Sequence, residues 1–304
     1  MTELPLPGAE PGPVVIGFDG TESAEDALAL GTLVSRGVGV PAIVTVVYPG
    51  PAPISSGRVD AEWVADRRRA AELIVDQARA LVGAGKPSGT QLEFRLTASS
   101  SGAHGLHDVA EEVGASVIVV GSKGKSADPR LFAGSTAERL FSGARCPVGI
   151  APHGLRRSDR ELRRIGVAYI DTPDAETALD VAARFAARAK ASLRLYIVVA
   201  EEAEVMPLFI GHDAERTFHE TAREEFQDAL ERAIAGLPAD IQATGEVLTG
   251  DVVKVLAELD EDEVDVLFCG SRRYGPLRRV LLGGVSSRLV RRARSPLIVV
   301  PRAE

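Results

Sequence analysis

Three glycines and a serine follow a strongly apolar run in the first half of the chain. Residues 117–120 (VIVV) have the composition of a buried strand, and Gly121, Gly124, Gly134 and Ser135 come after them. Glycine can adopt positive φ, and it lets main-chain N–H groups approach an anion where a Cβ would obstruct it. Ser135 opens a helical pattern, and a helix start favours negative charge because its first N–H groups are unpaired. This stretch therefore predicts a phosphate-binding loop.

Each of these residues also has an ordinary structural explanation. Asp19-Gly20 can be a simple turn, Ser135 can cap its helix, and Gly124 alone can mark a turn. The joint spacing, Gly-x2-Gly-x9-Gly-Ser, with Asp19 behind another strand, favours a nucleotide site over separate turns. Lys123 could help to neutralise a phosphate, although a solvated lysine is the more common case. The sequence contains no GxxxxGK[ST] loop and no set of residues with zinc-binding spacing.

The elements that must position this loop follow from alternating apolar runs and amphipathic stretches. We expect strands at residues 14–18, 42–47, 91–96, 116–120 and 147–150, and helices at residues 23–36, 60–83, 103–113 and 135–143. Ser23 with Asp26, and Ser135 with Glu138, have the spacing of capping boxes. The alternation predicts an α/β fold with a five-stranded, parallel, doubly wound sheet. Ligands of such sheets bind at the carboxyl ends of the strands.

The chain contains this pattern twice. Gly121, Gly134, Pro147 and Pro152 recur, at one constant spacing, as Gly270, Gly283, Pro296 and Pro301. A repeat of this length indicates two copies of one domain. We expect a first domain at residues 1–152, a polar linker at residues 153–164 and a second domain at residues 165–304.

The loop spacing, Asp19 after the first strand and the two copies together resemble the universal stress protein family in its tandem form. The resemblance covers residues 14–152 and 165–301. It implies two flavodoxin-like (adenine nucleotide alpha hydrolase-like) domains, ATP held between the first and fourth strands, with or without Mg²⁺, and a regulatory role. The family's nucleotide-binding positions fall on Asp19, Val46, Gly121, Gly124, Gly134, Ser135, Thr136 and Ala137.

The second copy departs from the pattern. Arg273 stands where the first copy has Gly124, Gly284 where it has Ser135, and Ile170 where it has Asp19. Arginine is disfavoured at positive φ by roughly 1 kcal/mol or more, and its bulk would crowd a triphosphate. We interpret this copy as a weakened nucleotide site; an electrostatic anion site built from its arginines stays open.

The last strand of each copy is expected at the edge of its sheet. Residues 147–150 and 296–300 are apolar, and an exposed apolar edge is a template for pairing with another strand. We expect the two copies to pair with each other or across chains through these edges. We expect a homodimer of tandem chains as the assembly.

Composition narrows the function. The net charge of −8 and the pI of about 5.3 argue against nucleic acid as the main partner. No apolar run approaches the ~20 residues that cross a bilayer, and residues 1–13 lack a signal pattern, so we expect no membrane partner and a cytoplasmic protein. The leading hypothesis is an ATP-binding stress-response regulator that uses the second copy mainly for assembly. A slow ATPase or phosphotransferase using Asp128 or Glu138, and a nucleotide-free protein-interaction module, are the alternatives.

Overall fold

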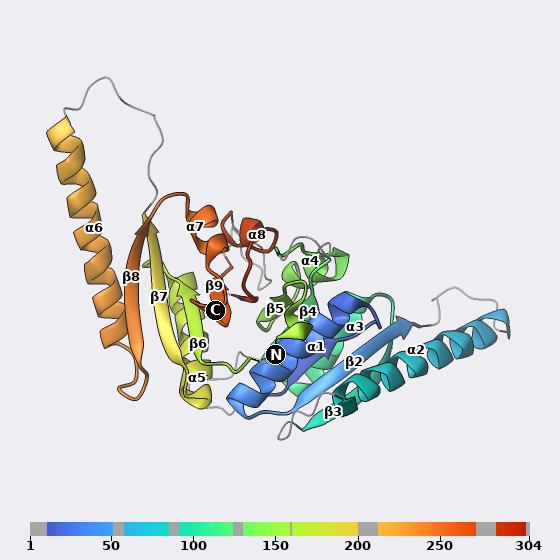
Figure 1. The fold of residues 1–304 in the computed structure, drawn as a ribbon. Coiled ribbons are helices and arrows are strands. Elements are labelled where there is room, and N and C mark those ends of the chain that lie inside the picture. The colour runs from blue at the N-terminus through green and yellow to red at the C-terminus, as the bar shows by residue number, and fades with distance from the viewer. Residues whose placement is uncertain are drawn as a thin grey trace.

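The two copies share one continuous sheet of ten strands (Figure 1). The computed structural model describes residues 11–50, 58–84, 91–123, 130–158, 160–199, 212–271 and 284–301. Within these residues the strand order is β3-β2-β1-β4-β5-β10-β9-β6-β7-β8. Every neighbouring pair is parallel except β5 and β10, which are antiparallel. Each half therefore has the doubly wound order that the sequence predicted.

The predicted elements of the first half are all present, with bounds shifted by a few residues. The first half comprises β1 (Val14–Gly17), α1 (Glu22–Val38), β2 (Ala42–Pro49), α2 (Arg58–Ala84), β3 (Leu92–Ser99), α3 (Gly102–Val113), β4 (Val117–Gly121), α4 (Ser135–Phe141) and β5 (Val148–Ala151). The second half comprises β6 (Arg164–Ala168), α5 (Pro173–Ala189), β7 (Ser192–Val199), α6 (His212–Ala235), β8 (Ala243–Thr249), α7 (Val252–Glu258), β9 (Val266–Gly270), α8 (Ser286–Leu289) and β10 (Leu297–Val300).

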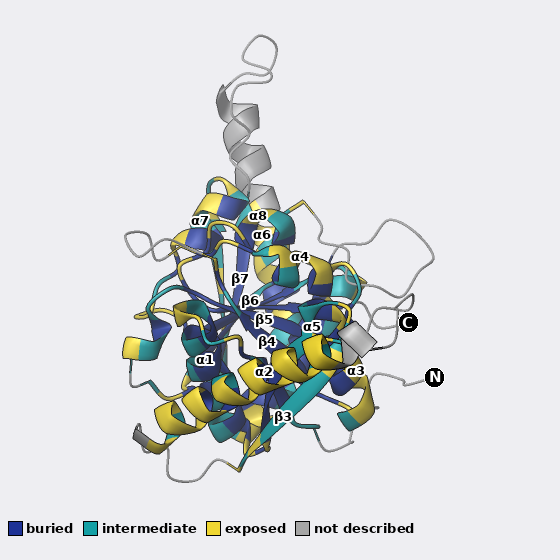
Figure 2. Cartoon of the chain, turned by 90° about the vertical axis from the view of Figure 1, so that its right-hand side faces the viewer, coloured by how far each residue is buried: buried dark blue, intermediate teal, exposed yellow. Residues whose placement is uncertain are grey.

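Helices cover both faces of the sheet, because its strands are apolar on both sides. One hydrophobic core lies under α1, α2, α5 and α6, with the buried side chains Ala27, Val75, Ala182 and Leu230. The other core lies under α3, α4, α7 and α8, with the buried side chains Leu106, Leu140, Leu256 and Leu289. Figure 2 shows the buried residues concentrated in the strands and the exposed residues on outer helix faces such as that of α2.

The closing strands of the two copies pair with each other. Leu297 lies opposite Ile150 and Val299 opposite Val148 in the antiparallel ladder between β5 and β10. The expected pairing between copies is thus confirmed, and it occurs within one chain. Each closing strand now has neighbours on both sides, so the predicted homodimer through these edges has no free edge to use. The sheet ends instead at β3 and β8.

The segment between the copies packs into the junction, although the sequence suggested only a polar linker. It contains a short 3-10 helix, η1 (Leu155–Arg157), whose Leu155 is buried. The carboxylate of Asp26 on α1 is fully buried and accepts hydrogen bonds from Gly154 N (3.0 Å), Arg156 N (2.9 Å) and Arg156 Nη1 (2.9 Å). Burial disfavours the charged guanidinium, but Asp26, Glu22 and Glu25 outweigh it and raise the pKa of Arg156.

Both expected capping boxes are wrong. Thr21 caps α1, because its Oγ1 accepts a hydrogen bond from Ala24 N, and Asp26 is engaged with the linker instead. Gly134 is the N-cap of α4 and makes no side-chain cap bond, so Ser135 is the first helical residue.

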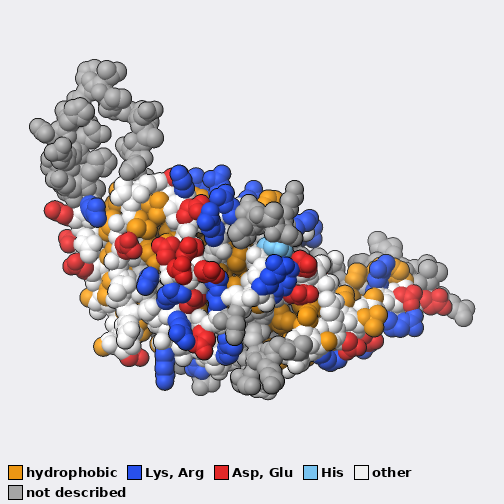
Figure 3. All heavy atoms as spheres, viewed as in Figure 1, with side chains coloured by type: hydrophobic (Ala, Val, Ile, Leu, Met, Phe, Trp, Pro, Cys, Tyr) orange, Lys and Arg blue, Asp and Glu red, His pale blue; other side chains and the backbone are white. Residues whose placement is uncertain are grey.

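The surface carries charges of both signs. On the face drawn in Figure 3, acidic and basic side chains are interspersed over the described residues. Among the described helices, none combines the length and the apolar character needed to cross a membrane.

Candidate functional site

A pocket of about 770 Å³ lies at the carboxyl ends of β1 and β4. This volume is within the ~300–1,000 Å³ typical of small-molecule sites. In the sheet, β1 and β4 are neighbours; the strand that follows β1 in sequence lies on the far side of β1, and the strand that follows β4 lies on the far side of β4. Such a point, where the strand order reverses, leaves a crevice that side chains of the neighbouring loops can line.

Six of the eight predicted binding residues line this pocket: Asp19, Gly121, Gly134, Ser135, Thr136 and Ala137. Gly124 lies outside the described residues. Val46 does not line the pocket. It is 2% exposed and packs into the core under α1 and α2. Successive strand residues face opposite sides of a sheet, so its neighbours Thr45 and Val47 line the pocket instead. Val46 as a binding residue stays a prediction.

Gly121 and Gly134 are glycines for different physical reasons. Gly121 does not have the positive φ expected for it; a Cβ there would lie 1.8 Å from the carbonyl oxygen of Ser23. The close approach of β4 to α1 therefore requires a glycine. Gly270 has the same role in the second half, where a Cβ would lie 2.5 Å from the carbonyl oxygen of Asp174.

Gly134 is not required by packing. Its φ of −79° is open to any residue, and a Cβ there would lie 3.5 Å from its nearest neighbour, the Cβ of Lys123. Ordinary side chains are thus compatible with the backbone at this position. The absence of a side chain leaves space in the pocket beside Lys123 and Ser135, which both line it.

A tight turn presents the carboxylate of Asp19 to the pocket. Asp19 Oδ1 accepts hydrogen bonds from Thr21 N (3.1 Å) and Thr21 Oγ1 (2.6 Å), and Gly20 has a φ of +81°. Asp19-Gly20 therefore does form the turn that the sequence allowed. The same turn holds an exposed carboxylate at the pocket wall, where it can accept hydrogen bonds from hydroxyl or amine groups.

The start of α4 faces the same space. The first main-chain bond of the helix runs from Glu138 N to Gly134 O (2.9 Å). The N–H groups of Ser135, Thr136 and Ala137 precede this bond and have no acceptor within the helix. Because Gly134 offers no side-chain cap, these donors are open to an anion in the pocket.

Two kinds of lining residue were not predicted. Val47 and Leu106 form an apolar wall from β2 and α3. His153 reaches the pocket from the segment after β5, with its side chain 9% exposed and its Nδ1 3.7 Å from Asp26 Oδ2. The only signal for His153 was its place directly after a strand that neighbours β4, at the same carboxyl edge of the sheet.

Comparison with known proteins decides the family. The model of the universal stress protein family matches residues 12–152 and 161–301. The chain belongs to the universal stress protein family. Universal stress protein Rv2319c of Mycobacterium tuberculosis is 26% identical over 293 residues, which cover 95% of this chain and 99% of the relative. The predicted family and tandem form are thereby confirmed.

Solved structures agree with the fold. The crystal structure of a universal stress protein from Archaeoglobus fulgidus has a TM-score of 0.64 at 22% identity, covering 94% of this chain and 97% of its own. A universal stress protein crystallised in complex with cAMP covers 37% of this chain and 77% of its own at 21% identity, with a TM-score of 0.29. At these levels of likeness, the Archaeoglobus fulgidus structure shows the fold alone. The cAMP is a ligand of the other protein, and nothing about this chain is concluded from it.

The second half of this universal stress protein lacks the acidic group of the first. Tyr169 N donates to Tyr196 O as Phe18 N donates to Thr45 O, so Ile170 takes the place of Asp19. Ile170 is 47% exposed, and the next residue, Asp171, forms an ion pair with Arg232 of α6 (3.4 Å). Gly284 is exposed, whereas Arg273 lies outside the described residues.

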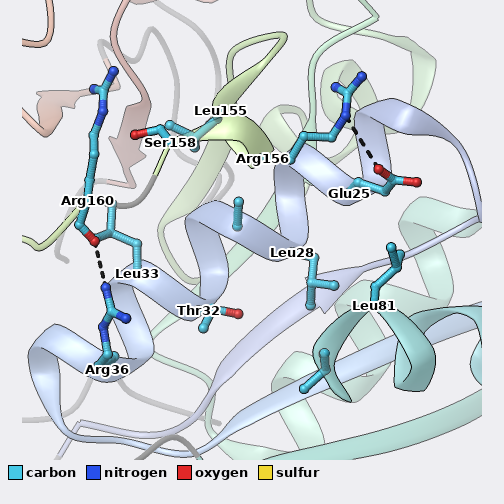
Figure 4. Close-up of a pocket in the computed structure, with 12 residues that line it drawn as sticks. Glu25, Leu28, Thr32, Leu33, Arg36, Leu81, Leu155, Arg156, Ser158 and Arg160 are labelled. Atoms are coloured by element: carbon cyan, nitrogen blue, oxygen red, sulfur yellow. Dashed lines mark hydrogen bonds and ion pairs between the residues drawn. The ribbon is translucent and has the colours of Figure 1, made fainter. Parts of the chain in front are cut away.

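A second cavity of about 290 Å³ lies between α1, α2 and the linker (Figure 4). Leucines form most of its apolar lining, and Arg36 donates to the carbonyl oxygen of Arg160 at one end (2.6 Å). Arg156 points toward Glu25 at the other end, at 3.4 Å. No glycine lines this cavity. The glycines and the helix start that the sequence assigned to phosphate lie at the pocket beside β1 and β4 and not at this cavity.

Proposed function

We propose that the first half binds ATP in the pocket at the carboxyl ends of β1 and β4 and that the protein is a nucleotide-binding stress-response regulator. One observation carries the proposal. The carboxylate of Asp19, the bare main chain at Gly134 and the unpaired N–H groups at the start of α4 converge on one pocket. These groups complement the two chemically different ends of a nucleotide, and the second half lacks the carboxylate.

Each end of ATP would meet a suitable part of the pocket. The N–H groups of Ser135, Thr136 and Ala137, with Lys123 beside them, suit a polyphosphate, because they supply donors and positive charge. The apolar side chains of Val47 and Leu106 suit the adenine ring. If Mg²⁺ accompanies ATP, phosphate oxygens and water would supply most of its ligands. The described residues contain no group of three His, Cys, Asp or Glu that could hold a metal ion.

Slow ATP hydrolysis is the second candidate, and one observation favours it. His153 lines the pocket beside the buried carboxylate of Asp26 and could accept a proton. The expected alternative base, Glu138, is not among the lining residues, and its Oε1 accepts from Arg291 Nη2 (3.0 Å). Asp128 lies outside the described residues. Binding without committed turnover is therefore the function that the site supports best.

The test is ATP binding by the Gly134→Glu variant. A glutamate fits the backbone at Gly134 and places a negative charge among the phosphates. Like charges about 4 Å apart repel by roughly 4 kcal/mol at an effective dielectric constant of about 20. We expect the affinity for ATP to fall about hundredfold or more in a calorimetric titration, with an unchanged unfolding transition.

The matched control is Gly83→Glu on α2, where a Cβ meets no atom within 4 Å. This control should bind ATP like the wild type. Retained affinity for ATP in Gly134→Glu would show that ATP does not bind in this pocket. ADP formed over many turnovers by the wild type, and lost in His153→Ala, would favour the enzymatic alternative.

A further inference from the structure

The segment that leads into the nucleotide pocket is held by the second half of the chain. Leu131 N donates to Ala293 O (2.7 Å), and Ala133 N donates to Val290 O (3.1 Å). The side chains of Leu131 and Ala133 are 1% and 3% exposed and lie in the same core cluster as Val290 and Ala293. The main-chain N–H groups of Leu131 and Ala133 therefore both bond to the turn that follows α8 in the second half.

The residue between these two contacts joins the same segment to the pocket. Phe132 N donates to Ser122 Oγ (2.7 Å), and Phe132 O accepts from Lys123 N (2.8 Å). Ser122 and Lys123 both line the pocket. Residues 131–133 are thus fixed on one side to the end of β4 and on the other side to the second half.

Ion pairs flank the contact on both sides. Arg130 lies 3.5 Å from Glu258 at the end of α7, and Arg291 lies 3.0 Å from Glu138 on α4. Gly134 follows Ala133 directly, and Ser135 begins α4. The position of the groups proposed to bind phosphate is consequently set by residues of the second half.

We propose that Val290, Arg291 and Ala293 are positioning residues for the nucleotide site of the first half. The second half, whose own site is weakened, holds the phosphate-binding segment of the first half in the geometry that binds the nucleotide. Such preorganisation strengthens binding because the loop need not be ordered when the ligand arrives. The coupling is reciprocal, so a bound nucleotide tightens the contact between the halves. This inference rests on the proposed function of the pocket.

The experiment compares two buried valines of the second half. Val290 is 0% exposed at the contact, and Val181 on α5 is 4% exposed in the other core. Val290→Ala and Val181→Ala remove the same atoms, and both are expected to lower the stability of the second half. We expect Val290→Ala to weaken ATP binding about tenfold and Val181→Ala to change it less than twofold, both measured by calorimetric titration of the full chain.

A second measurement needs no ligand. Amide hydrogen exchange at Lys123, Leu131 and Ala133 should accelerate in ligand-free Val290→Ala and stay unchanged in Val181→Ala. If the wild type binds no ATP, the proposed function fails, and the exchange rates still decide whether the second half holds the loop. If the wild type binds ATP and Val290→Ala binds it equally well, the positioning role is refuted.

Two exposed arginines provide a second test in case Val290→Ala fails to fold. Arg291 and Arg292 are both exposed, and Arg291 forms the ion pair with Glu138. Arg291→Ala should weaken ATP binding about twofold to fivefold, the range of an exposed ion pair. Arg292→Ala, which removes the same charge, should leave the affinity unchanged. Equal affinities of Arg291→Ala and the wild type would count against the positioning role of Arg291.

Discussion

Alanine at Gly121 should destabilise the protein, whereas alanine at Gly134 should change its stability little. The added Cβ at Gly121 would lie 1.8 Å from the carbonyl oxygen of Ser23, far inside any tolerable contact. Main chain must then move on both sides, since neither atom belongs to a flexible side chain. Overpacking of this kind costs about 1–3 kcal/mol, occasionally more, and we expect the upper part of this range.

At Gly134 the same substitution meets no obstacle. The φ of −79° suits alanine, and the nearest atom would be 3.5 Å away. Replacing glycine by alanine at a compatible φ typically adds about 0.4–1 kcal/mol, because the unfolded chain loses freedom. Gly134 is also the N-cap of α4, where glycine is preferred over alanine, so the two effects oppose each other and the net change should be small. Two glycines of one loop motif should therefore differ strongly in what alanine costs.

Urea unfolding of both variants measures this difference. Nucleotide must be removed first, because a bound ligand adds stability to the native state. We expect the midpoint of Gly121→Ala to fall and that of Gly134→Ala to change little, at a similar slope m. If both variants lose the same free energy of unfolding, the division between a packing glycine and a ligand-space glycine is wrong.

Three further outcomes are expected. Asp26→Ala should lower the free energy of unfolding by about 1–3 kcal/mol, because it leaves the N–H groups of Gly154 and Arg156 without their acceptor, while Glu22 and Glu25 still pair with the guanidinium. Urea denaturation checks this, and Asp171→Ala, which breaks an exposed ion pair, should cost less than about 1 kcal/mol. Burial raises the pKa of Cys269 to about 12, so its thiol should resist alkylation at pH 8 in the native protein and react after unfolding, as followed by peptide mass spectrometry. Between pH 9 and 12 the folded state should become less stable as pH rises, because in this range the thiol ionises only in the unfolded protein. Residues 1–152 expressed alone should self-associate in sedimentation experiments, because removal of β10 frees the edge of β5; a monomeric fragment would contradict this.

The fold followed from the sequence because its signals are local. Apolar runs such as residues 117–120 recur between amphipathic stretches, and this periodicity specifies strands and helices without tertiary information. The pairing of the closing strands was also foreseen, since an apolar edge needs a partner. The sequence left open whether that partner belongs to the same chain, because both arrangements bury the same residues.

The errors arose where distant segments meet. Asp26 has the spacing of a capping box, yet its hydrogen-bond partners lie at Gly154 and Arg156, far along the chain. The close approach of Gly121 to the carbonyl oxygen of Ser23 also depends on tertiary packing, so the sequence could not reveal it, and its assignment to phosphate stays a prediction. Val46 was assigned to the pocket through the family resemblance, and from an almost wholly apolar strand the sequence does not show which face of the sheet each residue occupies.

The stoichiometry of ATP binding tests the central claim most directly. Calorimetric titration of the nucleotide-free full chain should give one ATP per chain, and a crystal structure of the complex should place it between β1 and β4. No binding, two equivalent sites per chain, or ATP held only in the second half would contradict the account.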